Sequence, residues 1–121
     1  MATSTIKINP INNGGVAYSR ATLNSSYFSH GNVMYCKIGN IVILTISDLI
    51  LNANVTGGIV TDLITGLPSP VEGFSFLVSR YDTDETWRLF INTNGMIQSH
   101  YDAQTASQAQ WYGNFTYITR Q

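Results

Sequence analysis

The chain has 121 residues, a formal net charge of −1 and a pI near 6.0, and only 11% of its residues are charged, against about 25% in an average soluble protein. This length allows one domain with one hydrophobic core, and the charge balance gives no electrostatic footprint for nucleic acid or an anionic membrane surface. No apolar run approaches the roughly 18 residues of a membrane span, so we expect no membrane insertion. The single cysteine, Cys36, excludes an intrachain disulfide and is expected to be a packed thiol.

The first 15 residues precede the predicted globular domain, which covers residues 16–121. They lack the basic and apolar regions of a secretory signal, so we expect the chain to fold in the cytoplasm. Ile6 and Ile8 alternate with polar residues ahead of a glycine-rich turn, Asn12–Gly15. This pattern fits either a short edge strand or a tether.

Two apolar strands are predicted next, Val33–Lys37 and Ile41–Ser47, joined by a turn at Gly39–Asn40. The second is the most β-branched run of the chain, and it is apolar on both of its faces. No segment with convincing helical periodicity is available to cover the second face. We therefore expect an opposing sheet on one face and another copy of the protein on the other. The predicted interface residues are Ile41, Val42, Ile43 and Leu44.

Turn signals divide the rest of the chain into short strands. Asp48–Asn54 fits a strand or a short helix, and Gly57-Gly58 predicts a hairpin turn. The prolines of Gly66–Pro70 predict a rigid loop, because they remove backbone donors and restrict the residues before them. Asn94-Gly95 predicts a hairpin that joins two strands, and these strands are Arg88–Thr93 and Met96–Tyr101.

Alternating apolar residues predict which side chains of the later strands face the core. They are Phe74, Phe76 and Val78 in one strand and Trp87, Leu89 and Ile91 in the next. Phe115–Thr119 is expected to be a closing strand. About eight short strands with turns at regular spacing predict an all-β fold, an antiparallel β-sandwich of jelly-roll type.

The sequence has no pattern typical of a catalytic or metal site, so we predict no enzyme, no metal and no cofactor. His30 and His100 have no histidine or cysteine partner at metal-ligand spacing. The acidic loop Tyr81–Glu85 lacks the glycine and the distal glutamate of an EF-hand, and we interpret it as a solvated turn. A glycosidase requires two carboxylates about 5 to 9.5 Å apart, a separation that a sequence does not determine.

The chain is instead rich in aromatic residues, with seven tyrosines, five phenylalanines and two tryptophans. Aromatic faces cover the C–H patches of sugar rings while amide and charged groups bond to the hydroxyls, so this composition suits neutral, hydroxyl-rich ligands. The candidate saccharide-binding residues are His100, Tyr101, Asp102, Trp111, Tyr112 and Arg88. Trp111 and Tyr112 fit a subunit contact equally well.

Four features, taken in order, resemble the C-terminal domains of bacteriophage tail-fibre and receptor-binding proteins: Lys37–Val42, Gly66–Pro70, Ile91–Ile97 and Phe115–Ile118. The resemblance covers roughly Tyr35 to Arg120 and rests on the order and spacing of the motifs. It implies a homotrimeric β-sandwich at the tail tip or fibre of a virion, with host cell-surface saccharides and other tail or baseplate proteins as partners. It implies no specific contact residue. The sequence departs from such fibres because no long shaft of repeats precedes the predicted sandwich, and this leaves open a short baseplate or head-fibre component or a fragment of a longer fibre. The alternative is a purely structural trimeric protein of a virion tail or capsid fibre.

Overall fold

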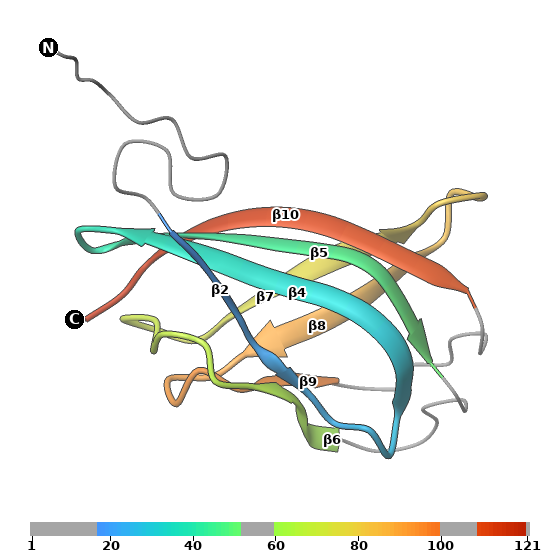
Figure 1. The fold of residues 1–121 in the computed structure, drawn as a ribbon, viewed down its shortest axis with the longest axis horizontal. Helices are drawn as coiled ribbons and strands as arrows, with labels where there is room; N and C mark the ends of the chain where they lie inside the picture. Colours follow the sequence, from blue (N-terminus) through green and yellow to red (C-terminus); the bar gives the residue numbers. More distant parts are fainter. Residues whose placement is uncertain (1–16, 52–59, 100–108, 121) are drawn as a thin grey trace, which may run out of the picture.

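The computed structural model describes residues 17–51, 60–99 and 109–120, and all regular secondary structure in these ranges is β-strand (Figure 1). The all-β prediction is therefore confirmed for this part of the chain. The tether or edge strand of residues 1–15 and the Gly57-Gly58 turn lie outside the described residues. The strands are β2 Tyr18–Arg20, β3 Thr22–Leu23, β4 Phe28–Ile38, β5 Ile41–Leu51, β6 Val60–Thr65, β7 Phe74–Arg80, β8 Thr86–Ile91, β9 Ile97–Ser99 and β10 Gln110–Ile118.

The strands form one antiparallel sheet in the order β2-β4-β5-β10-β7-β8-β9-β6-β3. Its two outer strands, β2 and β3, are separated only by Ala21, so the sheet curls into a nearly closed barrel. The Ala21 amide donates to the Val33 carbonyl at 2.9 Å, which ties this junction to β4. In Figure 1, β2, β4, β5 and β10 form a layer in front of β7 and β8. The strand order shows an antiparallel barrel-like sheet and does not show a jelly roll.

The two faces of β5 have different environments. Val42, Leu44 and Ile46 are almost completely buried and face the core of the same chain, whereas Ile41 is 45% exposed and Ile43 is half-buried. The second face of this strand is thus only partly covered by the part of the chain that the structure describes. Val42 and Leu44 are not available to a neighbouring copy, and the predicted subunit interface is narrowed to Ile41 and Ile43.

The core is closed by side chains from both layers. The rings of Trp87 and Trp111 meet edge to face with centroids 5.7 Å apart. The predicted inward alternation is confirmed for five residues of β7 and β8, and Phe74 is half-buried; the five are Phe76, Val78, Trp87, Leu89 and Ile91. Cys36 is a buried free thiol, as predicted.

The predicted turns at two glycines are also confirmed. Gly39, between β4 and β5, has φ +61°, and Gly95, between β8 and β9, has φ +76°. Both values lie in the left-handed region that favours glycine. A Cβ atom on Gly95 would also collide with the carbonyl oxygen of Leu67, so this hairpin packs closely against the proline-containing loop.

Candidate functional site

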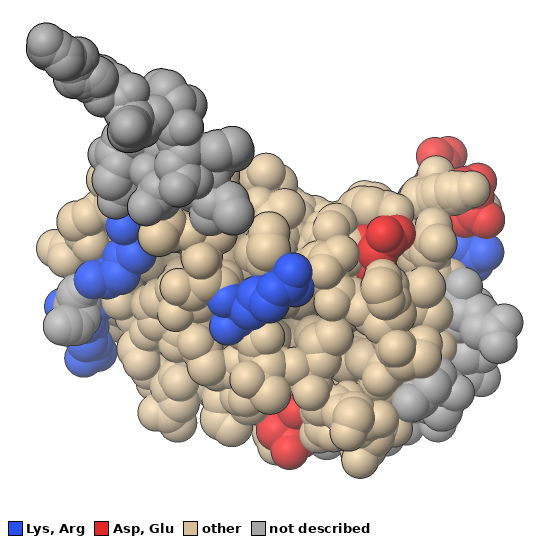
Figure 2. Space-filling view, in the orientation of Figure 1, with Lys and Arg blue, Asp and Glu red and all other residues tan. Residues whose placement is uncertain are grey.

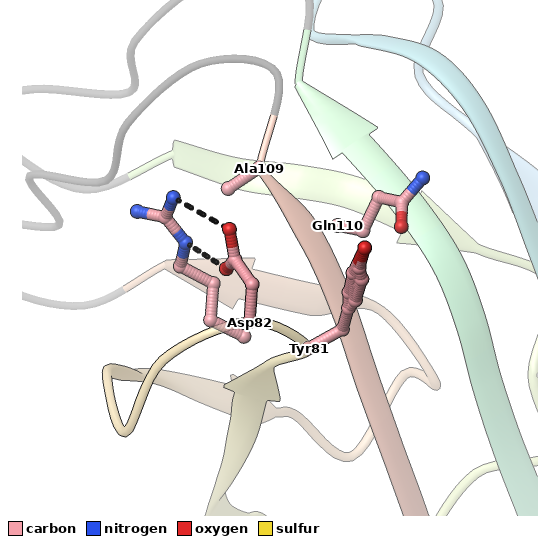
Figure 3. Close-up of a pocket in the computed structure, with 5 residues that line it drawn as sticks. Tyr81, Asp82, Ala109 and Gln110 are labelled. Atoms are coloured by element: carbon pink, nitrogen blue, oxygen red, sulfur yellow. Dashed lines mark hydrogen bonds and ion pairs between the residues drawn. The ribbon is translucent and has the colours of Figure 1, made fainter.

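A pocket of about 220 Å³ opens at the end of the barrel where β7 finishes and β10 begins. Its lining residues are Arg80, Tyr81, Asp82, Ala109 and Gln110 (Figure 3). The Tyr81 amide donates to the Gln110 carbonyl at 3.1 Å, and Arg80 pairs with Trp111 across the strands. The β7–β8 loop is therefore joined directly to the first residues of β10. We call this pocket the Tyr81 pocket.

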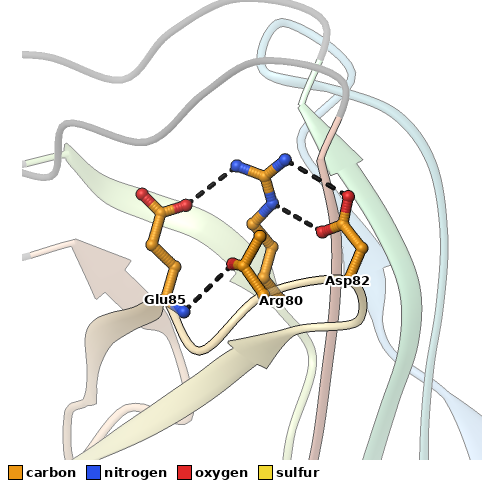
Figure 4. Close-up of polar contacts among 4 residues, drawn as sticks. Arg80, Asp82 and Glu85 are labelled. Atoms are coloured by element: carbon orange, nitrogen blue, oxygen red, sulfur yellow. Dashed lines mark hydrogen bonds and ion pairs between the residues drawn. The ribbon is translucent and has the colours of Figure 1, made fainter.

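Arg80 organises one wall of the Tyr81 pocket through two ion pairs (Figure 4). Its Nε atom lies 2.9 Å from Asp82 Oδ1, and its Nη1 atom lies 2.8 Å from Glu85 Oε1. The Arg80 amide also donates to the Glu85 carbonyl, and the Glu85 amide to Thr83 Oγ1. The hydrogen bond from Arg80 lowers the pKa of Asp82, and the bonds to Asp82 and Glu85 raise the pKa of Arg80. The Arg80–Asp82 pair therefore stays ionised over the neutral pH range.

Beside the Tyr81 pocket, a β-bulge changes the register between β5 and β10. In the β5–β10 ladder Trp111 pairs with Leu49 and Gly113 with Ile46, so Ser47 and Asp48 together oppose Tyr112. Asp48 has φ +53°, a conformation that Asp and Asn tolerate better than most residues.

The bulge brings Asp48 to the hydroxyl of Tyr112, which donates to Asp48 Oδ1 at 2.5 Å. This hydrogen bond, with partial burial, raises the pKa of Tyr112. The Tyr112 ring in turn lies 6.4 Å from the ring of Tyr81, which is 63% exposed. The site thus presents one exposed aromatic ring that stands beside an anchored one.

The structure describes three of the six predicted site residues, Arg88, Trp111 and Tyr112. His100, Tyr101 and Asp102 lie outside the described residues. Tyr112 contacts Tyr81 as described above. None of Tyr112, Trp111 and Arg88 lines the Tyr81 pocket itself.

Trp111 is 1% exposed and packs against Trp87, so it is a core residue rather than a ligand contact. The reason is strand geometry, because adjacent residues of β10 point to opposite faces and Tyr112 takes the outer one. Arg88 is exposed on β8, and its Nη1 atom donates to Ser75 Oγ at 3.4 Å.

Sequence reasoning did not identify Arg80, Tyr81, Gln110 or Asp48 as site residues. The sequence did contain a signal for Arg80, because this arginine directly precedes the acidic loop and can pair with the carboxylates of that loop. The closeness of Tyr81 to Gln110 depends on the pairing of β7 with β10, which a local pattern does not contain.

The Tyr81 pocket offers an aromatic face together with an amide, a carboxylate and a guanidinium, which are groups for binding hydroxyls. Among the described residues, no group of three or more histidine, cysteine or acidic side chains is placed to hold a metal ion. The described part also contains no helix long and apolar enough to cross a membrane. No protein-family model matches this chain, and a search of curated proteins found no match.

Proposed function

We propose that this protein is a receptor-binding module of a phage or prophage tail that binds a hydroxyl-rich saccharide of the host cell surface in the Tyr81 pocket, without cleaving it. The observation that carries the proposal is the exposed ring of Tyr81 beside fixed polar groups. The motif order that resembles phage receptor-binding domains supplies the biological setting. The finer fold assignment, a sandwich of jelly-roll type, is likewise a proposal, and it rests on the number and spacing of the strands in the sequence.

The chemistry of the pocket supports a sugar ligand. The face of Tyr81 can stack on the C–H face of a pyranose ring, while Asp82 accepts and Gln110 both donates and accepts hydrogen bonds. The Arg80 ion pairs are already formed, so little side-chain ordering is required on binding. The volume is below the roughly 300–1,000 Å³ of sites for drug-sized ligands. It therefore suits one terminal sugar residue, bound weakly.

Weak single sites are useful when they are repeated, and an apolar patch supports assembly. Ile41 lies directly opposite both Ile38 of β4 and Ile118 of β10, so the three share one face of the sheet. Each is between 45% and 57% exposed. We call these residues the isoleucine patch, and they form the contact between copies in the proposed homotrimer. Linked sites raise apparent affinity by about 10²–10⁴-fold without new contacts. The threefold symmetry rests on the family resemblance alone.

The second candidate function is a structural trimeric virion protein without a ligand. The isoleucine patch supports this structural function as much as it supports receptor binding, because an exposed apolar patch indicates contact with a protein and not with a sugar. Ligand binding is what separates the two functions.

A glycan array on the intact chain tests the proposal. Wild type is expected to bind a defined set of saccharides, and Tyr81→Ala to bind them about tenfold more weakly, because stacking and its buried area are lost. Tyr18→Ala is the matched control, since Tyr18 is also exposed but lies on β2 and does not line the pocket. An array without hits, or equal binding by Tyr81→Ala, would favour the structural function instead.

A further inference from the structure

A second cavity, of about 450 Å³, lies at the opposite end of the barrel from the Tyr81 pocket. It is lined by Lys37, Leu67, Pro68, Ser69, Thr119 and Arg120. Gln110 of the Tyr81 pocket begins β10, whereas Arg120 follows the end of the same strand, ten positions later. At about 3.3 Å per residue this separation is roughly 30 Å. The two cavities are therefore separate sites, and we call this one the Lys37–Arg120 cavity.

The walls of the Lys37–Arg120 cavity are held by hydrogen bonds between β10 and the proline-containing loop. Tyr117 Oη donates to the Pro68 carbonyl at 2.8 Å, and Thr119 Oγ1 donates to the Ser69 carbonyl at 2.6 Å. Burial raises the pKa of Tyr117, so its hydroxyl remains a donor over the neutral range. The Leu67 amide donates to the Gly95 carbonyl at 3.3 Å. These bonds from both sides of the loop indicate a cavity that exists before any ligand arrives.

The charged side chains that line the Lys37–Arg120 cavity are both basic. Lys37 lies opposite Val42, whose side chain faces the core, so Lys37 projects from the inner face of the sheet where the barrel opens. Arg120 contributes the second cation, and no acidic residue lines the cavity. In the part of the chain that the structure describes, both ion pairs belong to Arg80, and neither Lys37 nor Arg120 has a carboxylate within ion-pair distance.

The surface shows the same asymmetry. In the face drawn in Figure 2, basic side chains are visible at the end of the molecule where Figure 1 marks the C-terminus, and no acidic side chain is visible beside them. Acidic side chains gather toward the other end. On the face that is drawn, no carboxylate stands beside these basic groups; Arg120 also donates from Nη2 to the Val71 carbonyl at 3.4 Å, and the exposed Glu72 follows Val71 in the chain.

We propose that the Lys37–Arg120 cavity binds an organic carboxylate with an apolar or ring-shaped body, such as a uronic acid residue. The volume falls within the roughly 300–1,000 Å³ of small-molecule sites. The guanidinium of Arg120 matches the fork of a carboxylate, and Lys37 adds a second positive charge. Leu67 and Pro68 supply an apolar wall that an inorganic anion does not use. This proposal does not rest on saccharide binding at Tyr81.

An NMR titration of the full chain tests the inference. Methyl glucuronide is expected to shift the amide signals of Lys37, Ser69 and Thr119, and methyl glucoside, which has the same ring without the carboxylate, is expected to leave them unchanged. The Lys37→Gln/Arg120→Gln double variant should bind the glucuronide at least tenfold more weakly, because two charged hydrogen bonds are lost. Arg20→Gln is the control, since Arg20 is exposed on β2, donates to Asn32, and does not line the cavity.

Three results would overturn the assignment: equal binding of the glucoside, unchanged binding by a folded double variant, or sulfate binding as tightly as the glucuronide. Tyr81→Ala is expected to bind the glucuronide as tightly as wild type does. Weaker binding by this variant would mean that the glucuronide binds in the Tyr81 pocket. A uronic acid oligosaccharide that binds more tightly than the monosaccharide would identify a polysaccharide as the source of the ligand. Equal binding of the two would identify a free carboxylate. Both of these results support the site.

Discussion

Two isoleucines of β5 provide the sharpest test of how this strand is used. Ile46 is 1% exposed and faces the packed core, whereas Ile41 is 45% exposed on the outer face. Ile46→Ala is expected to lower the free energy of unfolding by about 2–5 kcal/mol, because it removes buried carbon atoms and leaves a cavity. Ile41→Ala removes the same three carbon atoms, worth roughly 2.4 kcal/mol if fully buried. Only about half of that area is covered, and no cavity forms, so the expected loss is about 1 kcal/mol.

Urea unfolding measured by tryptophan fluorescence reports these losses, because Trp87 and Trp111 are both core residues whose surroundings change on unfolding. The series is repeated over a range of protein concentrations. If the decrease in the free energy of unfolding caused by Ile41→Ala grows with protein concentration, the growing part measures the contribution of Ile41 to assembly. The part of the decrease that does not depend on concentration measures its contribution to the stability of the monomer. Equal losses for the two variants in monomeric protein would refute the two-faced description of β5.

Three further outcomes are expected. Ser99→Ala should leave the stability of the fold unchanged or slightly higher, because the Ser99 hydroxyl is buried and finds no hydrogen-bond partner in the described part of the chain. A decrease of more than about 2 kcal/mol in the free energy of unfolding would contradict this expectation. Asp48→Asn should bring the pKa of Tyr112 down toward its usual value in a spectrophotometric titration, since the charged acceptor that raises it is lost; an unchanged titration would mean that burial alone sets it. Arg80→Gln should raise the pKa of Asp82 in an NMR titration. Because folding depresses the pKa of Asp82, the ion pair stabilises the fold above the carboxyl's ordinary pKa of about 4, and this stabilisation is lost as the pH falls through the lowered pKa. Arg80→Gln should therefore be less stable than wild type near neutral pH, and the two proteins should become equally stable in acid.

The strands and turns that follow local rules were predictable from the sequence. Trp87, Leu89 and Ile91 are buried and alternate with residues that are exposed or half-buried, and this alternation identifies the buried face of β8. Asn94-Gly95 predicted its hairpin for a similar reason, because only a glycine readily adopts the left-handed conformation found there.

The inner face of β5 was not predictable, because the strand is apolar on both faces and its neighbours decide the orientation. The bulge left a trace that sequence reasoning missed. Val42 and Leu44 are buried at even positions, but Leu49 and Leu51 are buried at odd ones. Such a change of phase requires one extra residue between the two series, and Asp48 is that residue.

The candidate site was predictable only in part, as the different positions of Trp111 and Tyr112 show. Both aromatic residues stand together in the sequence, yet the strand sends one into the core and the other outward to Asp48. Tyr81 comes from a loop about thirty positions earlier, and only the pairing of β7 with β10 brings it to Tyr112. A single sequence contains the residues of this site but not the pairing that assembles it.

The position of the isoleucine patch along β10 determines how binding and assembly relate in the proposed trimer. Ile118 ends β10, and Gln110, which lines the Tyr81 pocket, begins it. The eight steps between them span roughly 26 Å at about 3.3 Å per residue. A neighbouring copy seated on the isoleucine patch would therefore leave the Tyr81 pocket open. It would lie close to the Lys37–Arg120 cavity, because Lys37 precedes Ile38 and Arg120 follows Ile118 by two positions. Changes in assembly should consequently alter carboxylate binding more than saccharide binding.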